Sequence, residues 1–314
     1  EHHAAILIWR GDYEEAEGEL QAAARELAAI SPATMPANLA RLGDLRRRQG
    51  RYAEAAALLA RAESSALATL GRAALALDQD DIESAIELAE RYFRRLPDGD
   101  RIQRVPGLAL LVRAYCRLGD HQRAESLLAE LRETAADVGT EALQAICNAC
   151  QGLVAACSGD HDAARSDFEL AIERFGRTGS PFEMALARIE LARSLWALGR
   201  PGAARDELEG ARALFDELDA RGEAERARSL LREIGGGGTA SEPSDDERRS
   251  AHGLTARQLD VLRHLALGLG NREIARRLYL SEPTVKRHVA DILTRLDLPT
   301  RAAAASYAAR NDLL

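Results

Sequence analysis

Residues 281–296 (SEPTVKRHVADILTRL) hold several side chains that can donate hydrogen bonds to an anion. Lys286 is the only lysine of the chain, and it lies beside Arg287. Fixed cations on one face of a helix are suited to phosphate groups and to the edges of purine bases. This pattern predicts a helix that lies in the major groove of DNA.

The same residues have the apolar spacing of an amphipathic helix. Val285, Val289, Ile292 and Leu296 recur at i, i+4, i+7 and i+11, so they form one stripe that can pack against neighbouring helices. The Ser281 hydroxyl can cap the first turn, because serine accepts a hydrogen bond from a free backbone N–H at a helix start. We therefore expect the helix to begin at Ser281.

Three further short helices should support this one. Residues 255–258 (TARQ) form a capping box that opens a helix ending before Gly268 and Gly270, and Asn271 is expected to cap a second helix. Thr300 is expected to cap a last, alanine-rich helix. The turn before residue 281 has the length found in helix-turn-helix motifs.

Charge divides the chain into a basic end and an acidic body. Residues 252–314 carry ten Arg or Lys and six Asp or Glu, a balance of +4, whereas the whole chain of 314 residues has a net charge of −8. The remainder therefore carries −12. Aromatic residues make up only 4% and β-branched runs are absent, which predicts an all-α protein whose basic end alone approaches nucleic acid.

One pattern returns along the first two-thirds of the chain: a Gly, a polar residue, and an Ala five positions after the Gly. The Gly can take the left-handed conformation at a helix end, and the small Ala lets two helices approach closely. The copies pair Gly11 with Ala16, Gly50 with Ala55, Asp80 (in place of Gly) with Ala85, Gly119 with Ala124, Gly159 with Ala164 and Gly199 with Ala204.

These copies predict pairs of helices that stack into a right-handed superhelix with a concave surface. They resemble tetratricopeptide repeats, although most copies start 39 or 40 residues apart, against a usual period of about 34. Residues 221–234 are expected to form a capping helix on the exposed end of the stack. The groove of such an array binds an effector, either a small molecule or a protein, whose identity the sequence does not give.

Residues 235–250 (GGGGTASEPSDDERRS) contain four consecutive glycines and lack apolar periodicity. They predict a flexible linker, which spans about 20–25 Å as a random coil. The expected domains are a repeat array at 1–234, the linker at 235–250 and a DNA-binding domain at 251–314.

The terminal segment resembles the DNA-binding domain of LuxR-type (GerE, NarL-like) transcription factors, from residue 254 to about residue 311. The matching residues are Leu254-Thr255, Val261-Leu262, Gly268-Leu269, Asn271, Glu273-Ile274-Ala275, Leu280-Ser281, Thr284-Val285-Lys286, His288-Val289 and Ile292-Leu293. This resemblance implies four helices with a helix-turn-helix, and a regulator, expected to be an activator, that binds palindromic double-stranded DNA as a homodimer.

The resemblance also implies roles for individual residues. The base-reading positions fall on Lys286, Arg287 and Ala290. The phosphate contacts fall on Thr284, His288, Asn271, Arg272 and Arg276, and the dimer contacts of the last helix fall on Ala302, Ala305 and Ala309.

Repeats followed by such a domain resemble the large ATP-binding LuxR regulators (MalT-like), which also carry a nucleotide-binding module. A P-loop requires Gly-Lys-Ser/Thr, but Lys286 is the only lysine, so this chain holds no such module. The chain begins without Met and enters a helical pattern at once. We therefore expect that the chain was cut from a longer protein, and that an ATPase module, if the protein has one, lies in the missing part.

Other residues that could carry chemistry have plainer explanations. Cys147 and Cys150 form a single CxxC, which supplies at most half of a zinc site, and packing in a repeat helix accounts for them better. The aromatic residues expected in the core are Trp9, Tyr13, Tyr52 and Trp196.

The leading hypothesis is a bacterial transcription regulator of the cytoplasm, whose array senses a ligand or partner and frees or dimerises the terminal domain. The sequence has no zinc-protease motif, no nucleophile elbow, no signal peptide and no apolar run of about 18 residues, so an enzyme, a cofactor and a membrane protein are not expected. The alternative is a repeat scaffold that binds a partner protein, with DNA binding secondary.

Overall fold

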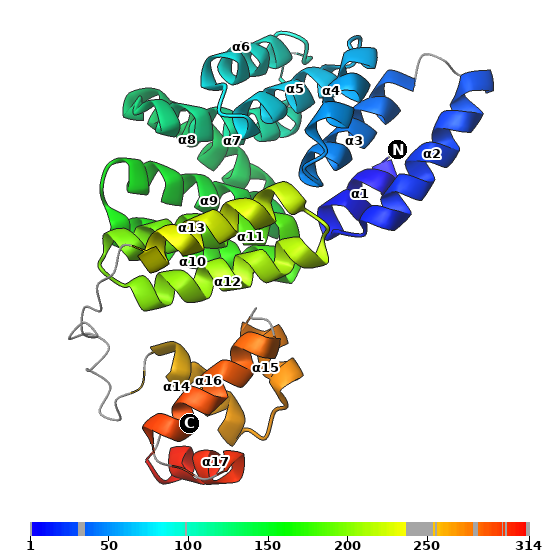
Figure 1. Ribbon diagram of the computed structural model, residues 1–314. Helices are drawn as coiled ribbons and strands as arrows, with labels where there is room; N and C mark the ends of the chain where they lie inside the picture. Colours follow the sequence, from blue (N-terminus) through cyan, green and yellow to red (C-terminus); the bar gives the residue numbers. More distant parts are fainter. Residues whose placement is uncertain are drawn as a thin grey trace.

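A computed structural model of the chain describes residues 2–30, 35–97, 99–236, 254, 256–278, 282–296, 298 and 300–311. This part of the chain is all-helical, as the composition predicts (Figure 1). The helices are α1 His2–Arg10, α2 Tyr13–Ile30, α3 Met35–Arg48, α4 Tyr52–Arg61, α5 Ala66–Asp78, α6 Ile82–Phe93, α7 Arg101–Leu118, α8 His121–Val138, α9 Glu141–Cys157, α10 His161–Thr178, α11 Pro181–Ala197, α12 Pro201–Glu217, α13 Arg221–Gly236, α14 Ala256–Ala266, α15 Asn271–Leu278, α16 Glu282–Arg295 and α17 Arg301–Arg310.

The six predicted repeat turns join α1 to α2, α3 to α4, and so on to α11 and α12. Their five glycines have φ between 71° and 85°, and Asp80 takes the same left-handed conformation at φ 65°. The alanine five positions after each turn is fully buried in every copy. The repeat pattern is therefore confirmed, including the copy in which Asp replaces Gly. The left-handed turns at Gly139 and Gly179, which separate one helix pair from the next, were not predicted.

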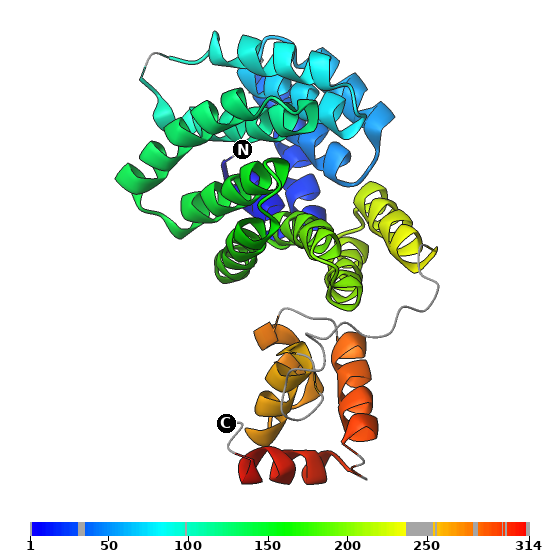
Figure 2. The same cartoon turned by 90° about the vertical axis from the view of Figure 1, so that its left-hand side faces the viewer.

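The pairs stack along a curve (Figures 1 and 2). Odd-numbered helices from α3 to α11 each contact the next odd-numbered helix, so they form the inner layer of the curve. The even-numbered helices lie outside them.

The stack closes on itself, because its first helices meet its last ones. Arg48 of α3 pairs with Glu183 of α11 at 2.9 Å. A Cβ atom on Gly50 would lie 2.7 Å from the backbone N of Gly222, at the start of α13. We call this contact of α1–α4 with α11–α13 the seam; Figure 2 shows α13 approaching the first repeats.

Helix α13 differs from the expected capping helix in two respects. Its first turn lies in the seam instead of covering an open end. It also continues to Gly236, two residues into the predicted linker. The rest of that linker, residues 237–250, lies outside the described residues.

Three of the four aromatic residues expected in the core are at least partly buried. Tyr13 is buried, and Trp9 packs edge-on against Phe175 with 6.2 Å between ring centroids. Tyr52 is half-buried. The expectation is wrong for Trp196, which is 43% exposed because it lies in the last turn of α11, where the inner layer meets solvent.

The two cysteines of the CxxC are buried in the core between α7, α8 and α9, in agreement with a packing role. Within the described ranges, no group of three or more His, Cys, Asp or Glu side chains is placed to share a metal ion. None of the described helices has the length and apolar character that a membrane span requires.

Candidate nucleic-acid interface

Helices α14 to α17 share one core at the C-terminal end of the chain. The predicted stripe of α16 contributes Val285, Val289 and Ile292, all of them buried, while Leu296 packs at its edge. Ile274 and Ala275 of α15 close the other side of this core. The residues predicted to face the core from α15 and α16 are therefore confirmed. Ser281, the expected cap of α16, lies outside the described residues.

The turn between α14 and α15 is built on two glycines. Gly268 takes φ 78°, and the backbone N–H of Leu269 reaches back to the carbonyl of His264 at 3.2 Å. Gly270 then begins α15, because its carbonyl accepts from the backbone N–H of Ile274 at 2.9 Å and its own N–H donates to the Glu273 carboxylate at 2.8 Å.

Asn271 was expected to cap α15, and this expectation is wrong because Gly270 and Glu273 already satisfy that end. The Asn271 side chain instead accepts a hydrogen bond from the Arg301 guanidinium at 2.5 Å. Arg301 also donates to the Leu269 carbonyl. Arg301, the first residue of α17, thus holds the turn between α14 and α15 in place.

Four of the residues implied in DNA binding present solvent-exposed side chains. Lys286 and Ala290 are one turn apart on α16, and Arg272 and Arg276 are one turn apart on α15. Side chains at i and i+4 share a helix face, so each pair forms a short exposed strip. The side chains of Thr284 and Arg287 lie outside the described residues.

His288 has a different environment from these four. Its side chain is buried, with only 3% of the residue exposed, and its Nε2 lies 3.9 Å from Asp206 Oδ2 on α12. Helix α16 contacts α12 directly (Figures 1 and 2). In this arrangement His288 faces the array and is not accessible to the phosphate that was expected to contact it. Nothing in the sequence near either residue indicated this pair, which joins positions far apart in the chain.

The last helix has the predicted cap and an alanine-rich surface. The Thr300 hydroxyl accepts from the backbone N–H of Ala303 at 3.2 Å. Ala304 and Ala308 are buried in the domain core, whereas Ala302 is exposed and Ala305 is half-buried. The side chain of Ala309 lies outside the described residues. A dimer contact through this helix stays a prediction.

The sequence of this terminal segment matches a known family. The family described as "Bacterial regulatory proteins, luxR family" matches residues 252–308. YhcZ, an uncharacterized transcriptional regulatory protein of Bacillus subtilis (strain 168), is 42% identical over 69 residues, which make up 22% of this chain and 32% of that protein. The nitrate/nitrite response regulator protein NarP of Escherichia coli (strain K12) is 51% identical over 51 residues, or 16% and 24% of the two chains. The match thus spans about a third or less of these relatives.

The fold of the whole chain is similar to that of a Rap protein whose crystal structure contains Competence and Sporulation Factor. The TM-score is 0.61 at 16% identity, over 99% of this chain and 94% of that one. This similarity concerns the fold. The C-terminal part of the chain is therefore a LuxR-type helix-turn-helix domain, and the part before it is an array of tetratricopeptide-like repeats similar in fold to Rap proteins.

Proposed function

We propose that this protein is a DNA-binding transcription regulator whose repeat array controls the access of α16 to DNA. The observation that carries the proposal is the LuxR-type domain, whose exposed basic strips on α15 and α16 flank a buried core. The relatives named above are transcriptional or response regulators, which supports the assignment. The division into an array at 1–234, a linker at 235–250 and a DNA-binding domain at 251–314 belongs to the proposal, with the array extended to Gly236.

In the proposed complex, α16 enters the major groove. Lys286 and Arg287 donate to guanine O6 and N7, and Ala290 offers apolar contact to a thymine methyl. Arg272, Arg276, Thr284, His288 and the backbone near Asn271 bind phosphates, which fixes the orientation of the domain. Two copies joined through Ala302, Ala305 and Ala309 of α17 read a palindrome whose half-sites lie about 34 Å apart.

The contact between α12 and α16 supports control by the array. A helix with its side chains is about 10–12 Å across and the major groove is about 12 Å wide, so groove walls flank a bound helix on both sides. α12 occupies one side of α16 and covers His288. The docked arrangement is therefore incompatible with binding of α16 in the major groove. Release of the domain activates transcription in the cytoplasm.

What releases the domain is, in this proposal, an effector bound by the array. A Rap protein of similar fold was crystallised with Competence and Sporulation Factor, which supports ligand binding as a capacity of such arrays. The second candidate function is a scaffold that binds a partner protein, with DNA contact secondary.

The test is selection of a duplex from random DNA by the full chain at low salt, followed by affinity measurements on the selected palindrome. Lys286→Ala should weaken binding about tenfold, since one good donor pair to guanine contributes about 1–3 kcal/mol. Arg263→Ala removes an exposed cation from α14 and is the control. If no duplex is selected, or if both variants weaken binding equally, the scaffold function is favoured instead.

A further inference from the structure

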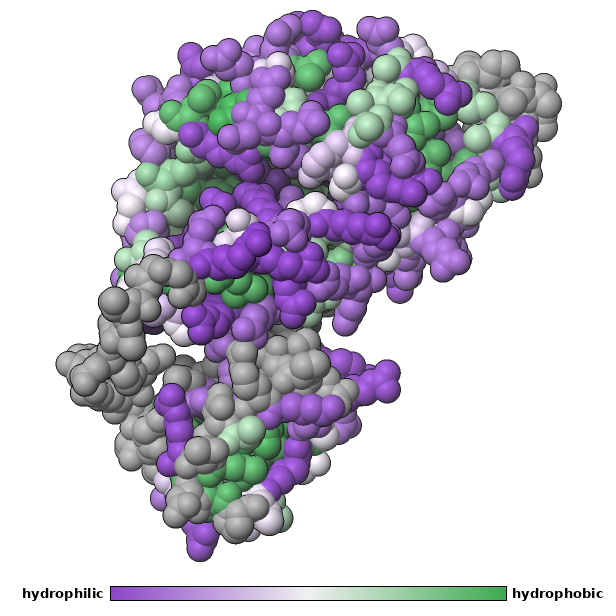
Figure 3. All heavy atoms as spheres, viewed as in Figure 1, coloured by the Kyte–Doolittle hydropathy of each residue, from purple (hydrophilic) through white to green (hydrophobic). Residues whose placement is uncertain are grey.

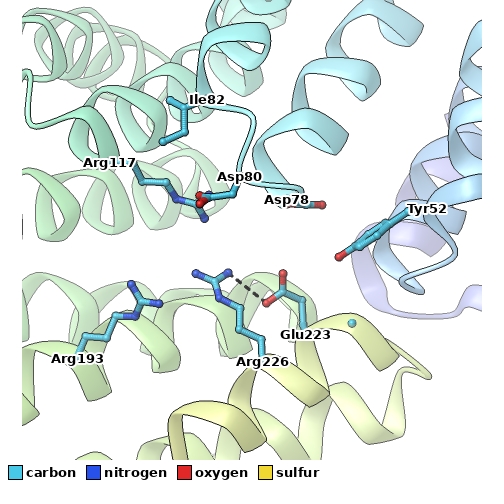
Figure 4. A pocket seen from close by; sticks show the side chains of 9 residues that line it. Tyr52, Asp78, Asp80, Ile82, Arg117, Arg193, Glu223 and Arg226 are labelled. Atoms are coloured by element: carbon cyan, nitrogen blue, oxygen red, sulfur yellow. Dashed lines mark hydrogen bonds and ion pairs between the residues drawn. The ribbon is translucent and has the colours of Figure 1, made fainter. Parts of the chain in front are cut away.

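A cavity of about 560 Å³ lies between the first and last repeats, beside the seam. Three arginines from separate helices line it: Arg117 at the end of α7, Arg193 on α11 and Arg226 on α13. Figure 4 shows Arg117 and Asp80 on one side of the opening and Arg193, Arg226 and Glu223 on the other. Cavities of about 300–1,000 Å³ are typical of small-molecule sites.

The guanidinium groups of this cavity are loosely paired. Arg226 lies 3.4 Å from Glu223 and 3.9 Å from Glu190. Arg117 lies 3.6 Å from Asp80 and also donates to the Leu77 carbonyl at 2.7 Å. Within the described part of the chain, the one ion pair of Arg193 is to Glu190, at 3.9 Å. A guanidinium carries five N–H donors, so each of these groups retains donors for a further acceptor.

Ion pairs just behind the cavity wall are much tighter. Asp78, which also lines the cavity, is held by Arg47 at 2.6 Å, and Arg48 holds Glu183 at 2.9 Å. Asp78 therefore has a close partner outside the cavity. The shorter pairs, Arg47 with Asp78 and Arg48 with Glu183, stabilise the fold. The longer pairs inside the cavity are those that a bound ligand can replace.

The cavity holds charges of both signs, and they act differently on its arginines. At Arg226, burial lowers the pKa, but the carboxylates of Glu223, Glu190 and Asp78 outweigh burial and raise the pKa. Burial, together with the neighbouring guanidinium groups of Arg226 and Arg113, lowers the pKa of Arg117 below its ordinary value. Cations held close together in a partly dry site gain from an anion that binds between them. Opposite them, the half-buried Tyr52 faces the cavity with its hydroxyl group (Figure 4).

We propose that this cavity binds a small organic anion, whose carboxylate or phosphate group is held by Arg117, Arg193 and Arg226 and whose uncharged polar part reaches Tyr52. Arginine forks match the geometry of both oxyanions, which is why the two share one proposal. The inference rests on the proposed function, because it makes this ligand the effector that the array senses.

The position of the cavity connects it to the docked DNA-binding domain. Tyr52, Asp80 and Arg117 belong to the first half of the array, and Arg193 and Arg226 belong to the second. Arg226 lies on α13, which packs on α12, the helix in contact with α16. A ligand that joins the two sides fixes α13 against the first repeats and thereby changes the support of α12.

The test is calorimetric titration of the full chain with sodium pyrophosphate and, separately, with sodium citrate, at constant ionic strength. Arg193→Gln is the informative variant, because its side chain is 49% exposed and loosely paired, so the fold tolerates the change. Arg91→Gln is the matched control, on α6, with a side chain 50% exposed. At least one of the two anions should bind at millimolar concentration, and Arg193→Gln should raise its Kd about tenfold while Arg91→Gln leaves it unchanged.

Each outcome decides the proposal. Binding of pyrophosphate alone assigns a phosphorylated ligand, and binding of citrate alone assigns a carboxylate. Absence of binding by both anions, or equal weakening in the two variants, overturns the site. DNA affinity is measured on the same protein samples, so that the two proposals can fail separately. If the protein binds DNA but neither anion, the proposed anion site is wrong. If it binds an anion but no DNA, the proposed regulator function is wrong.

Discussion

Two contacts join parts of this protein that are distant in sequence, and they are built differently. At the seam, Arg48 lies between Asp44 at 3.1 Å and Glu183 at 2.9 Å, and its guanidinium lies 4.7 Å from the centre of the Phe182 ring. At the second contact, between α12 and α16, His288 Nε2 lies 3.9 Å from Asp206 Oδ2. At the first contact the distances are short and Arg48 has several partners; at the second contact the distance is longer.

This difference indicates which contact opens during function. A buried charge that loses its partner is costly, so the seam stays closed. The distance of 3.9 Å between His288 and Asp206 is longer than a hydrogen bond, and histidine is charged only when protonated, so this pair holds the docked domain less firmly than Glu183 holds Arg48. The seam therefore keeps the first and last repeats together while the LuxR-type domain detaches.

The largest expected effect comes from breaking the seam. Glu183→Gln leaves Arg48 short of one negative partner and should lower the free energy of unfolding by about 3–5 kcal/mol. Glu87→Gln, which breaks the exposed pair of Glu87 with Arg91, should cost less than about 0.5 kcal/mol. Urea denaturation of both variants measures the difference. Similar losses in the two would mean that the seam is no stronger than a surface pair.

A pair of glycines provides a second test of the seam. Gly50 and Gly119 have φ of 76° and 75°, so alanine at either position bears the left-handed cost of about 1–2 kcal/mol. A Cβ on Gly119 meets nothing within 4 Å, whereas on Gly50 it meets the backbone N of Gly222 at 2.7 Å. Gly50→Ala should therefore lower the melting temperature clearly more than Gly119→Ala. Equal shifts would show that the seam yields without cost.

Acid should weaken the seam. Burial disfavours the Asp44 carboxylate, but the guanidinium groups of Arg47 and Arg48 outweigh it and hold the pKa of that carboxyl well below its ordinary value. Its contribution is thus complete above the unfolded pKa, about 3.9, and is lost as pH falls below it, at up to about 1.4 kcal/mol per pH unit. Denaturation at pH 4 to 2 measures this slope. Asp44→Asn should flatten the profile, and an unchanged slope in that variant would contradict the assignment.

The smallest effect is expected at the docked domain. Asp206→Asn weakens the contact with His288, whose 3.9 Å distance is longer than a hydrogen bond, and should raise the DNA affinity of the full chain by a few-fold. Glu217→Gln removes the same charge from an exposed position at the end of the same helix and is the control. Fluorescence anisotropy on the selected duplex compares them. If the two variants gain equally, removal of charge rather than release explains the result.

The features that the sequence predicted correctly are those that local patterns encode. A left-handed turn followed five positions later by Ala predicts the packing of two adjacent helices. The apolar stripe from Val285 to Ile292 predicts which face of α16 is buried. Asn271 was misassigned because Gly270 and Glu273 compete for the same cap and Arg301 arrives from thirty positions away. The seam and the cavity depend on the sum of small rotations between repeats, which no short pattern contains. The pair of His288 with Asp206 depends on where the terminal domain docks on the array, which neither local sequence indicates.

Closure of the stack also fixes how many helix pairs it can contain. An open solenoid tolerates gain or loss of a unit, because each repeat touches its neighbours alone. Here the rotations from each helix pair to the next must add up so that the first repeats meet the last ones, with Trp9 against Phe175 and Gly50 against Gly222. Duplication of one pair would separate these partners. Arrays descended from this one should therefore vary in loop length and surface composition while keeping their number of repeats.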